Sequence, residues 1–280
     1  MRRISMLGLL LAAFVWEPGA LADPAHDHYM RGMQLRRAGK LEPAIEAFHM
    51  ALKERPDYAA ARLGLAHTLR RLKRLPEAAA AYRAVVKAQP RNANAWYMLG
   101  ITEHRLKRPE EAIKAMKKAV DLGEKDPALH RDMGTILKSL KRFPEAADAF
   151  RRATQAEPKN AESWSMLGVC LSQANRHREA LAAHDQALRL APNSSSNLFN
   201  AAVAYRRDGK RERAMELYQK TIRIDPNAAS AYFDLGVLHQ AKGDKQEAIK
   251  LFLTYLKKAE HRLSVNERKA VQDRIDRLQR

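Results

Sequence analysis

The chain of 280 residues contains one cysteine, Cys170, and only 12 glycines and 12 prolines. A single cysteine cannot form an intramolecular disulfide, which excludes a disulfide-stapled scaffold. We expect Cys170 to be buried by packing, with a reactive or intermolecular thiol as the alternative, because no cationic or polar neighbour is placed to activate it. Little glycine or proline, together with 46% hydrophobic residues, indicates a folded, all-helical chain rather than a disordered one.

Motifs that carry catalysis are also missing. The ten histidines include no His-Glu-x-x-His pattern, and the sequence has no paired cysteines, no glycine-rich phosphate loop and no strand pattern. The tripeptide His-Asp-His at 26–28 could bind a metal, but two flexible imidazoles and one carboxylate do not preorganise a site, so we interpret it as a frayed first turn. We therefore expect no enzymatic activity, no cofactor and no metal.

The apolar run Ile4–Trp16 is too short to cross a bilayer comfortably. It follows Arg2-Arg3 and precedes Ala20-Leu21-Ala22, and this order of charge, apolar core and small-x-small site is typical of a secretory signal. We predict that residues 1–22 are a signal peptide cleaved after Ala22, that the mature protein is exported to the periplasm, and that it has no transmembrane span. A retained anchor is the alternative.

What the sequence does contain is a 34-residue period. Each period holds two apolar stripes of helical spacing, such as Trp164, Leu167 and Leu171 in one and Leu181 and Leu188 in the next. Between these stripes Asn175 stands where a helix ends in a left-handed residue. An alanine recurs in every period: Ala44, Ala78, Ala112, Ala146, Ala180, Ala214 and Ala248. A proline recurs at Pro56, Pro90, Pro158, Pro192 and Pro226, with Glu124 as the interruption.

This pattern, with Leu-Gly steps at Leu99-Gly100, Leu167-Gly168 and Leu235-Gly236, resembles the tetratricopeptide repeat (TPR) family over roughly 240 of 280 residues. The resemblance implies an all-α fold, a right-handed superhelical α-solenoid of seven TPR helical hairpins across residues 23–262. Residues 263–280 are expected to form a C-terminal capping helix that begins with a Ser264–Glu267 capping box. His130, His184 and His239 fall where such repeats carry large core residues, so we interpret them as packing substitutions.

The resemblance further implies that the fifth residue of each repeat lines a concave groove that captures extended peptides or helices. Aromatic groups there would supply apolar anchors for a partner. The predicted groove residues are Tyr29, Leu63, Tyr97, Arg131, Phe199 and Phe233, with Ser165 at the remaining equivalent position.

Acidic residues are scarce, with 32 Asp and Glu against 51 Lys and Arg. Removing Arg2, Arg3 and Glu17 with the signal leaves a net charge of +18, and the six-residue turns of the seven hairpins, with 20 basic and two acidic residues, account for all of it. Stacking would align these turns along one edge. One cation per helix C-terminus offsets the helix dipole, but three or four per turn exceed that need. This predicted basic edge comprises Arg36, Arg37, Arg70, Arg71, Lys73, Arg74, Arg105, Lys107, Arg108, Lys138, Lys141, Arg142, Arg206, Arg207, Lys210 and Arg211.

These features favour a non-catalytic protein-protein interaction scaffold exported to the cell envelope. Its expected partner is an acidic, or mixed acidic and apolar, polypeptide bound through the groove and the basic edge. The alternative is a binder of anionic envelope polysaccharide or a lipid surface through the basic edge alone. Nucleic acid fits the charge, but export argues against it.

Overall fold

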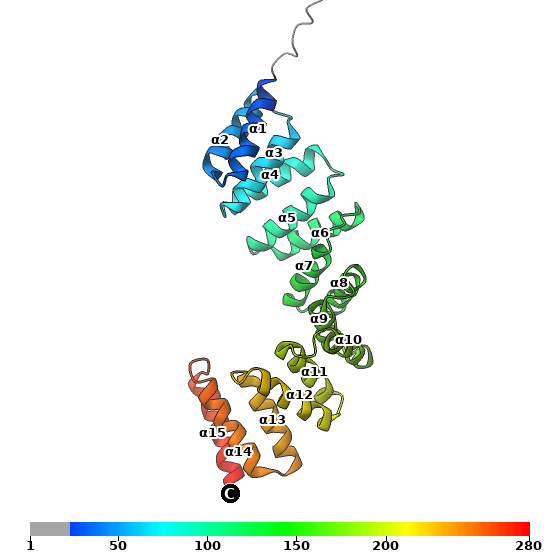
Figure 1. Cartoon of the computed structure of the whole chain (residues 1–280), viewed down its shortest axis with the longest axis vertical. Coiled ribbons are helices and arrows are strands. Elements are labelled where there is room, and N and C mark those ends of the chain that lie inside the picture. Colours follow the sequence, from blue (N-terminus) through cyan, green and yellow to red (C-terminus); the bar gives the residue numbers. More distant parts are fainter. Residues whose placement is uncertain (1–22) are drawn as a thin grey trace, which may run out of the picture. The chain divides into compact units, whose positions relative to one another are not determined.

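The computed structural model describes residues 23–280, and all regular structure in this range is helical (Figure 1). The predicted signal at 1–22 lies outside the described residues. Residues 23–280 divide between two compact units that meet in sequence at Pro90 and Arg91. The first unit holds α1 (Pro24–Arg37), α2 (Leu41–Glu54), α3 (Ala59–Arg71) and α4 (Leu75–Ala88).

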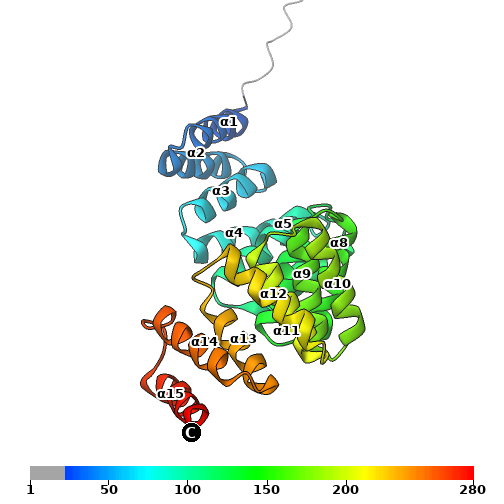
Figure 2. The same cartoon turned by 60° about the horizontal axis from the view of Figure 1, so that its bottom comes forward.

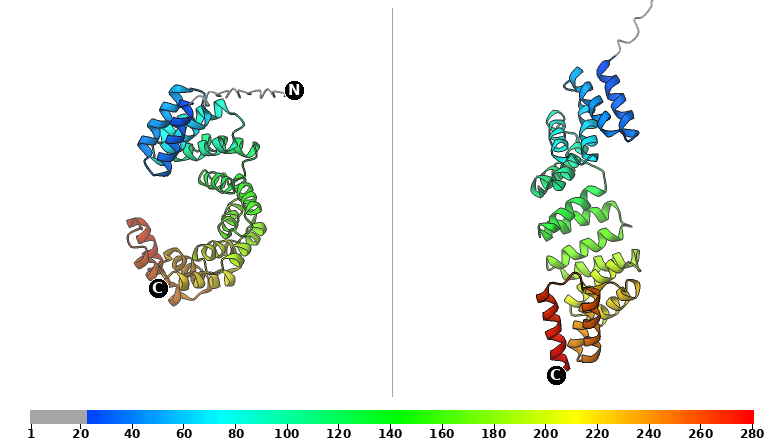
Figure 3. Two further views of the ribbon diagram at one scale, coloured as in Figure 1. Left: turned by 45° about the horizontal axis from the view of Figure 1, so that its top comes forward. Right: turned by 90° about the vertical axis from the view of Figure 1, so that its left-hand side faces the viewer.

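The second unit holds the remaining helices. These are α5 (Ala93–Arg105), α6 (Pro109–Asp121), α7 (Ala128–Ser139), α8 (Phe143–Ala156), α9 (Ala161–Gln173), α10 (His177–Leu190), α11 (Ser195–Arg207), α12 (Arg211–Ile224), α13 (Ala229–Lys242), α14 (Lys245–Lys258) and α15 (Val265–Gln279). Within this unit successive hairpins follow one another along an arc, which the left view of Figure 3 shows in the green to red part of the chain. Figure 2 shows α13 and α14, the last hairpin of this unit, followed by α15. The predicted all-α solenoid of seven helical hairpins and a C-terminal helix is confirmed.

Each hairpin turns at one left-handed residue, and these residues repeat every 34 positions. Asn175 has the expected positive φ of 61°. Its amide donates to the Ser172 carbonyl, and the Arg176 amide donates to the Leu171 carbonyl, so the turn satisfies carbonyls that the end of α9 leaves free. The other left-handed turn residues are Gly39, Lys73, Lys107, Lys141, Gly209 and Gly243.

Small residues let the two helices of a hairpin approach closely. The periodic alanines are at most 1% exposed. One turn further along the second helix stands a large side chain that fits against a glycine of the first helix: Phe150 lies on Gly134, and Phe252 lies on Gly236. In α10 this large residue is His184, which is 1% exposed, so its interpretation as a packing substitution is confirmed.

Cys170 also belongs to this interior. It is 0% exposed, and burial raises the pKa of its thiol to about 11. A thiol with that pKa carries almost no thiolate at neutral pH, so the structural interpretation of Cys170 is confirmed.

The C-terminal helix α15 begins with the predicted capping box. The Ser264 hydroxyl accepts from the Glu267 amide, and the Glu267 carboxylate accepts from the Ser264 amide. Val271 and Ile275 of this helix are buried against a cluster that contains Ile249 and Phe252 of α14. The helix therefore covers an apolar face of the last hairpin.

Candidate interaction surfaces

The predicted groove residues of the first unit are half-buried aromatic or apolar side chains. Tyr29 packs its ring 5.3 Å from that of Tyr58 and 6.1 Å from that of Phe48, measured between centroids. The guanidinium of Arg55 lies 4.6 Å from the Tyr58 ring centroid. Leu63 of α3 is also half-buried. This unit thus presents a small aromatic cluster bordered by a cation.

In the second unit the predicted groove residues differ in depth. Tyr97 is 2% exposed, and its hydroxyl donates to Asp132 Oδ2 at 2.8 Å. Burial and the Asp132 carboxylate raise the pKa of Tyr97, so the phenol stays protonated. Arg131 is half-buried and forms an ion pair with Glu157. Both side chains therefore already have partners within the fold.

Phe199 and Phe233 have different neighbours. Phe199 meets Tyr218 edge to face, with 5.8 Å between centroids, and lines an open hollow of about 380 Å³ together with Asp225 and Asn227. Phe233 packs against Phe252 of α14, and Arg274 of α15 lies 5.7 Å from the Phe233 ring centroid. Among these aromatic groups Phe199 borders open space, whereas Phe233 is partly covered by the C-terminal helix.

At two repeat junctions a polar contact links the fifth residue of one repeat to the sixth residue of the next. Tyr97 donates to Asp132, and Asn200 Nδ2 donates to Ser165 Oγ at 3.1 Å. Sequence reasoning missed these contacts, because it compared only equivalent positions of the repeats, which are 34 residues apart. The signal was present as complementary polar residues spaced 35 positions apart, one more than the period.

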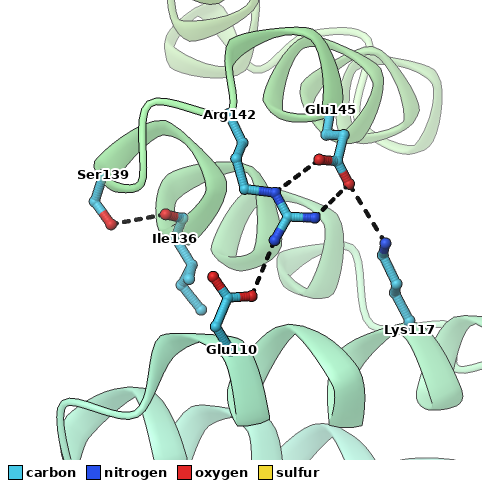
Figure 4. A network of polar contacts seen from close by, with 6 residues as sticks. All are labelled: Glu110, Lys117, Ile136, Ser139, Arg142 and Glu145. Atoms are coloured by element: carbon cyan, nitrogen blue, oxygen red, sulfur yellow. Dashed lines mark hydrogen bonds and ion pairs between the residues drawn. The ribbon is translucent and has the colours of Figure 1, made fainter.

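The predicted basic edge is partly neutralised by ion pairs within the fold. Arg142 Nε and one terminal nitrogen donate to the two carboxylate oxygens of Glu145, both at 2.7 Å, and the other terminal nitrogen donates to Glu110 at 3.0 Å (Figure 4). The hydrogen bond from Arg142 lowers the pKa of the Glu145 carboxyl. Arg74 holds Glu77 in the same bidentate manner. The charge count from the sequence alone did not identify these pairs.

Most of the edge remains unpaired. Besides Arg74 and Arg142, ion pairs involve Arg108 with Glu103, Arg206 with Asp234, and Lys210 with Asp208. Within residues 23–280 the other edge residues form no ion pair with an acid. These are Arg36, Arg37, Arg70, Arg71, Lys73, Arg105, Lys107, Lys138, Lys141, Arg207 and Arg211.

Three lysines of the edge occupy left-handed turn positions. The φ angles of Lys73, Lys107 and Lys141 are 63°, 62° and 59°, at the positions where other hairpins carry Gly39 or Gly209. A left-handed conformation costs a residue with a β-carbon about 1 kcal/mol or more relative to glycine. All three side chains are exposed. The local backbone therefore does not account for lysine at these positions.

Two further predictions concern ions and membranes. Across residues 23–280 no three or more His, Cys, Asp or Glu side chains come together in an arrangement that could hold a metal ion. In the same part of the chain, no helix has the length and apolar character needed to cross a membrane.

Comparison with known families agrees with the 34-residue period. A family model described as tetratricopeptide repeat matches residues 29–90 and 67–127, and one described as the cytochrome c-type biogenesis protein H TPR domain matches residues 145–262. The chain belongs to the tetratricopeptide repeat family. A search of curated proteins found no match.

Solved TPR structures resemble the chain. The crystal structure of YrrB, described as a TPR protein with an unusual peptide-binding site, is 27% identical, covers 71% of this chain and 99% of its own, and has a TM-score of 0.63. The C-terminal part of a TPR protein from Cytophaga hutchinsonii is 16% identical over 82% of this chain and 94% of its own, with a TM-score of 0.68. MamA is 22% identical over 62% and 97%, with a TM-score of 0.56. The last two share the fold alone.

Proposed function

We propose that this TPR protein is an exported, non-catalytic scaffold that binds an acidic, or mixed acidic and apolar, polypeptide through its groove and basic edge. The TPR repeats themselves support a general role in protein-protein interaction. The observation that carries the acidic partner is the placement of Lys73, Lys107 and Lys141 at left-handed positions that favour glycine. Compensation of the helix dipole does not require a lysine at the left-handed position, because a lysine one residue away would compensate it equally well. An anionic partner therefore explains these lysines better, despite the cost of their backbone conformation.

Three further observations support this proposal. Eleven edge residues have no acidic partner within residues 23–280, so their charge is available to a ligand. Phe199 borders an open hollow, where a desolvated apolar contact could form. The resemblance to YrrB, a protein described as having a peptide-binding site, is consistent with a polypeptide ligand.

Export is proposed from the signal pattern of residues 1–22. Asp23, the first residue after the expected cleavage site, is the N-cap of α1 and accepts from the His26 amide. A mature chain that starts at Asp23 would therefore keep this helix cap. Mass spectrometry of the intact protein from fractionated cells should give the mass of residues 23–280 in the periplasmic fraction, and a chain retaining Met1 in the cytosol would contradict export.

The binding proposal is tested with a photo-crosslinker at Phe199 in the exporting cell, followed by rapid-mixing kinetics with the partner that is captured. The triple variant Arg105→Glu, Lys107→Glu and Lys141→Glu should slow association at low salt and lose this effect as salt shortens the Debye length to about 8 Å. Phe199→Ala should mainly speed dissociation.

The matched control reverses three exposed cations outside the edge: Lys114→Glu, Lys118→Glu and Arg178→Glu change the net charge equally. If both triple variants slow association to the same extent, overall charge rather than the edge is responsible. If crosslinking yields only polysaccharide or lipid and Phe199→Ala has no effect, the alternative function of anionic polymer or surface binding replaces this one.

A further inference from the structure

In several repeats the fourth residue has a bulky side chain that donates a hydrogen bond to the end of the preceding repeat. Trp164 Nε1 donates to the Pro158 carbonyl at 2.9 Å, and the Tyr232 hydroxyl donates to the Pro226 carbonyl at 3.3 Å. In both cases the acceptor is the periodic proline six residues earlier. An aromatic ring with a hydrogen-bond donor therefore fits the junction between two repeats, because the ring fills space and its donor satisfies the carbonyl of the periodic proline.

In the fourth and sixth repeats the fourth residue is smaller than tryptophan or tyrosine, and a cavity lies at each of these two positions. Leu198 borders a cavity of about 620 Å³ between α10 and α12, and His130 borders one of about 320 Å³ between α6 and α8. The two positions are 68 residues apart, which is two periods. Both volumes lie within the range of roughly 300 to 1,000 Å³ that is usual for ligand pockets. Each cavity thus lies where the third, fifth and seventh repeats carry a tryptophan or tyrosine side chain.

The cavity at Leu198 has an apolar interior and a cationic rim. Leu188, Leu198 and Leu217 line it together with Pro192. Leu198 has no donor group, and within residues 23–280 no hydrogen bond reaches the Pro192 carbonyl. The site therefore offers apolar walls and one free acceptor, the two features that Trp164 uses in the preceding repeat.

The rim of this cavity carries four cations, and three of them have no acid partner in the described part of the chain. Arg213 pairs with Glu216 at 2.8 Å, and Asp185 accepts from the Tyr205 hydroxyl at 2.6 Å, so both rim acids are engaged. The free cations are Arg189, Lys220 and Arg223. The rim is therefore complementary to acidic residues that flank an inserted side chain.

The two cavities differ at the mouth. Lys117 of α6 and Glu145 of α8, which both line the cavity at His130, form an ion pair at 3.4 Å (Figure 4). The equivalent residues at the other cavity, two periods later, are Asp185 and Arg213, which pair with other residues instead of with each other. The Leu198 cavity consequently lacks this bridge.

We propose that the cavity at Leu198 is a second peptide-binding site, which receives a tryptophan or tyrosine side chain from an acidic polypeptide. The inserted ring replaces the missing aromatic residue of the sixth repeat and donates to the Pro192 carbonyl, while Arg189, Lys220 and Arg223 contact flanking carboxylates. This inference rests on the proposed function only for the acidic nature of the partner, because the site involves neither the predicted groove residues nor the basic edge.

The test uses a synthetic acetylated pentapeptide, Asp-Glu-Trp-Glu-Asp, with 5-fluorotryptophan as the probe for fluorine NMR. We expect saturable binding to the protein with a Kd of roughly 10 to 1,000 μM. The substitution Leu198→Trp should fill the cavity from within and weaken binding by about tenfold or more. His130→Trp is the matched control, because it fills the bridged cavity two periods earlier and should leave peptide binding unchanged.

A second variant tests the site independently, in case Leu198→Trp weakens binding by disturbing the fold. Lys220→Glu with Arg223→Glu changes only the rim and should also weaken binding about tenfold, whereas Lys114→Glu with Lys118→Glu should not. Equal affinity for the peptide with alanine in place of tryptophan, or unchanged binding by Leu198→Trp, would overturn the proposal. Reversal of Arg105, Lys107 and Lys141 should leave this binding intact, so failure here is distinguishable from failure of the proposed function.

Discussion

The imidazole of His184 lies directly on the α-carbon of Gly168, across the contact between α9 and α10. A β-carbon at position 168 would come within 2.7 Å of His184 Cε1 and Nε2. His184 itself is 1% exposed. The two residues therefore fix how closely the helices of the fifth hairpin approach.

The substitution Gly168→Ala should destabilise this hairpin by about 1 to 3 kcal/mol, because the added methyl group has no room beside the buried ring. Urea unfolding of residues 23–280, which lack Trp16, is followed by Trp164 fluorescence in a Trp96→Phe background and so reports on α9 itself. The same alanine in a His184→Ala protein should cost much less, since the space is then vacant. Additive costs in the double variant would show that the two residues are not coupled.

The fifth hairpin should also become less stable as the pH is lowered, because of His184. Burial lowers the pKa of His184 to about 4, from about 6.5 in the unfolded chain. As pH falls from 6.5 to 4 the unfolded chain takes up a proton that the folded chain excludes, so the loss reaches about 3 kcal/mol at most. Above pH 6.5 this residue contributes no pH dependence.

The measurement compares urea midpoints of the wild type and His184→Phe at pH 7 and pH 4.5. Phenylalanine occupies the equivalent position at Phe150 and does not titrate. The variant should lose less stability on acidification. Burial likewise lowers the pKa of His67 in α3 to about 4. The wild type and the variant should therefore share a remaining loss of stability on acidification that comes from His67. Identical losses in both proteins would sink the assignment to His184.

The period in the sequence predicted the fold because each repeat places a small residue, a large residue and a left-handed turn at fixed spacing. Asn175 at the turn and Ala180 at the helix contact were both predicted from their places in this period. The capping box of Ser264 and Glu267 was also predictable, since its partners are three residues apart. Features that depend on local spacing were therefore visible in the sequence.

The surfaces could not be predicted to the same degree, because they depend on neighbours in other repeats. Tyr97 and Phe199 share a repeat position, yet Tyr97 is buried beside Asp132 and Phe199 borders a hollow. Likewise, the distribution of charge along the edge did not show that Arg142 contacts both Glu145 and Glu110, since Glu110 lies 32 residues away. Side-chain depth and pairing required the three-dimensional arrangement.

The substitution Lys107→Gly should stabilise the protein by about 1 kcal/mol, because glycine adopts φ of 62° without steric cost. Thermal unfolding monitored by circular dichroism measures the change. Lys114→Gly is the control, since it removes an equal charge from the exposed middle of α6 and should destabilise by about 1 kcal/mol. A lower melting temperature for Lys107→Gly would mean that its side chain makes a stabilising contact, and lysine there would then need no functional explanation.

Removal of α15 should loosen the last hairpin while leaving distant ones folded. Truncation of Ser264–Arg280 uncovers Ile249 and Phe252, which are at most 8% exposed in the full chain, and removes Arg274 from the face of the Phe252 ring. Because solenoid repeats are stabilised mainly by their immediate neighbours, the loss should decay along the array. Hydrogen exchange should show lost protection in α13 and α14 and unchanged protection in α5 to α8.

The matched variant Val271→Asp with Ile275→Asp keeps the chain length but places two carboxylates on the buried face of α15. Burying unpaired charges is unfavourable, so α15 should detach and reproduce the exchange pattern of the truncation. Agreement between the two variants would assign the effect to the loss of this apolar contact rather than to a shorter chain. Uniform loss of protection from α5 to α14 in either protein would instead show that the second unit unfolds as one cooperative body.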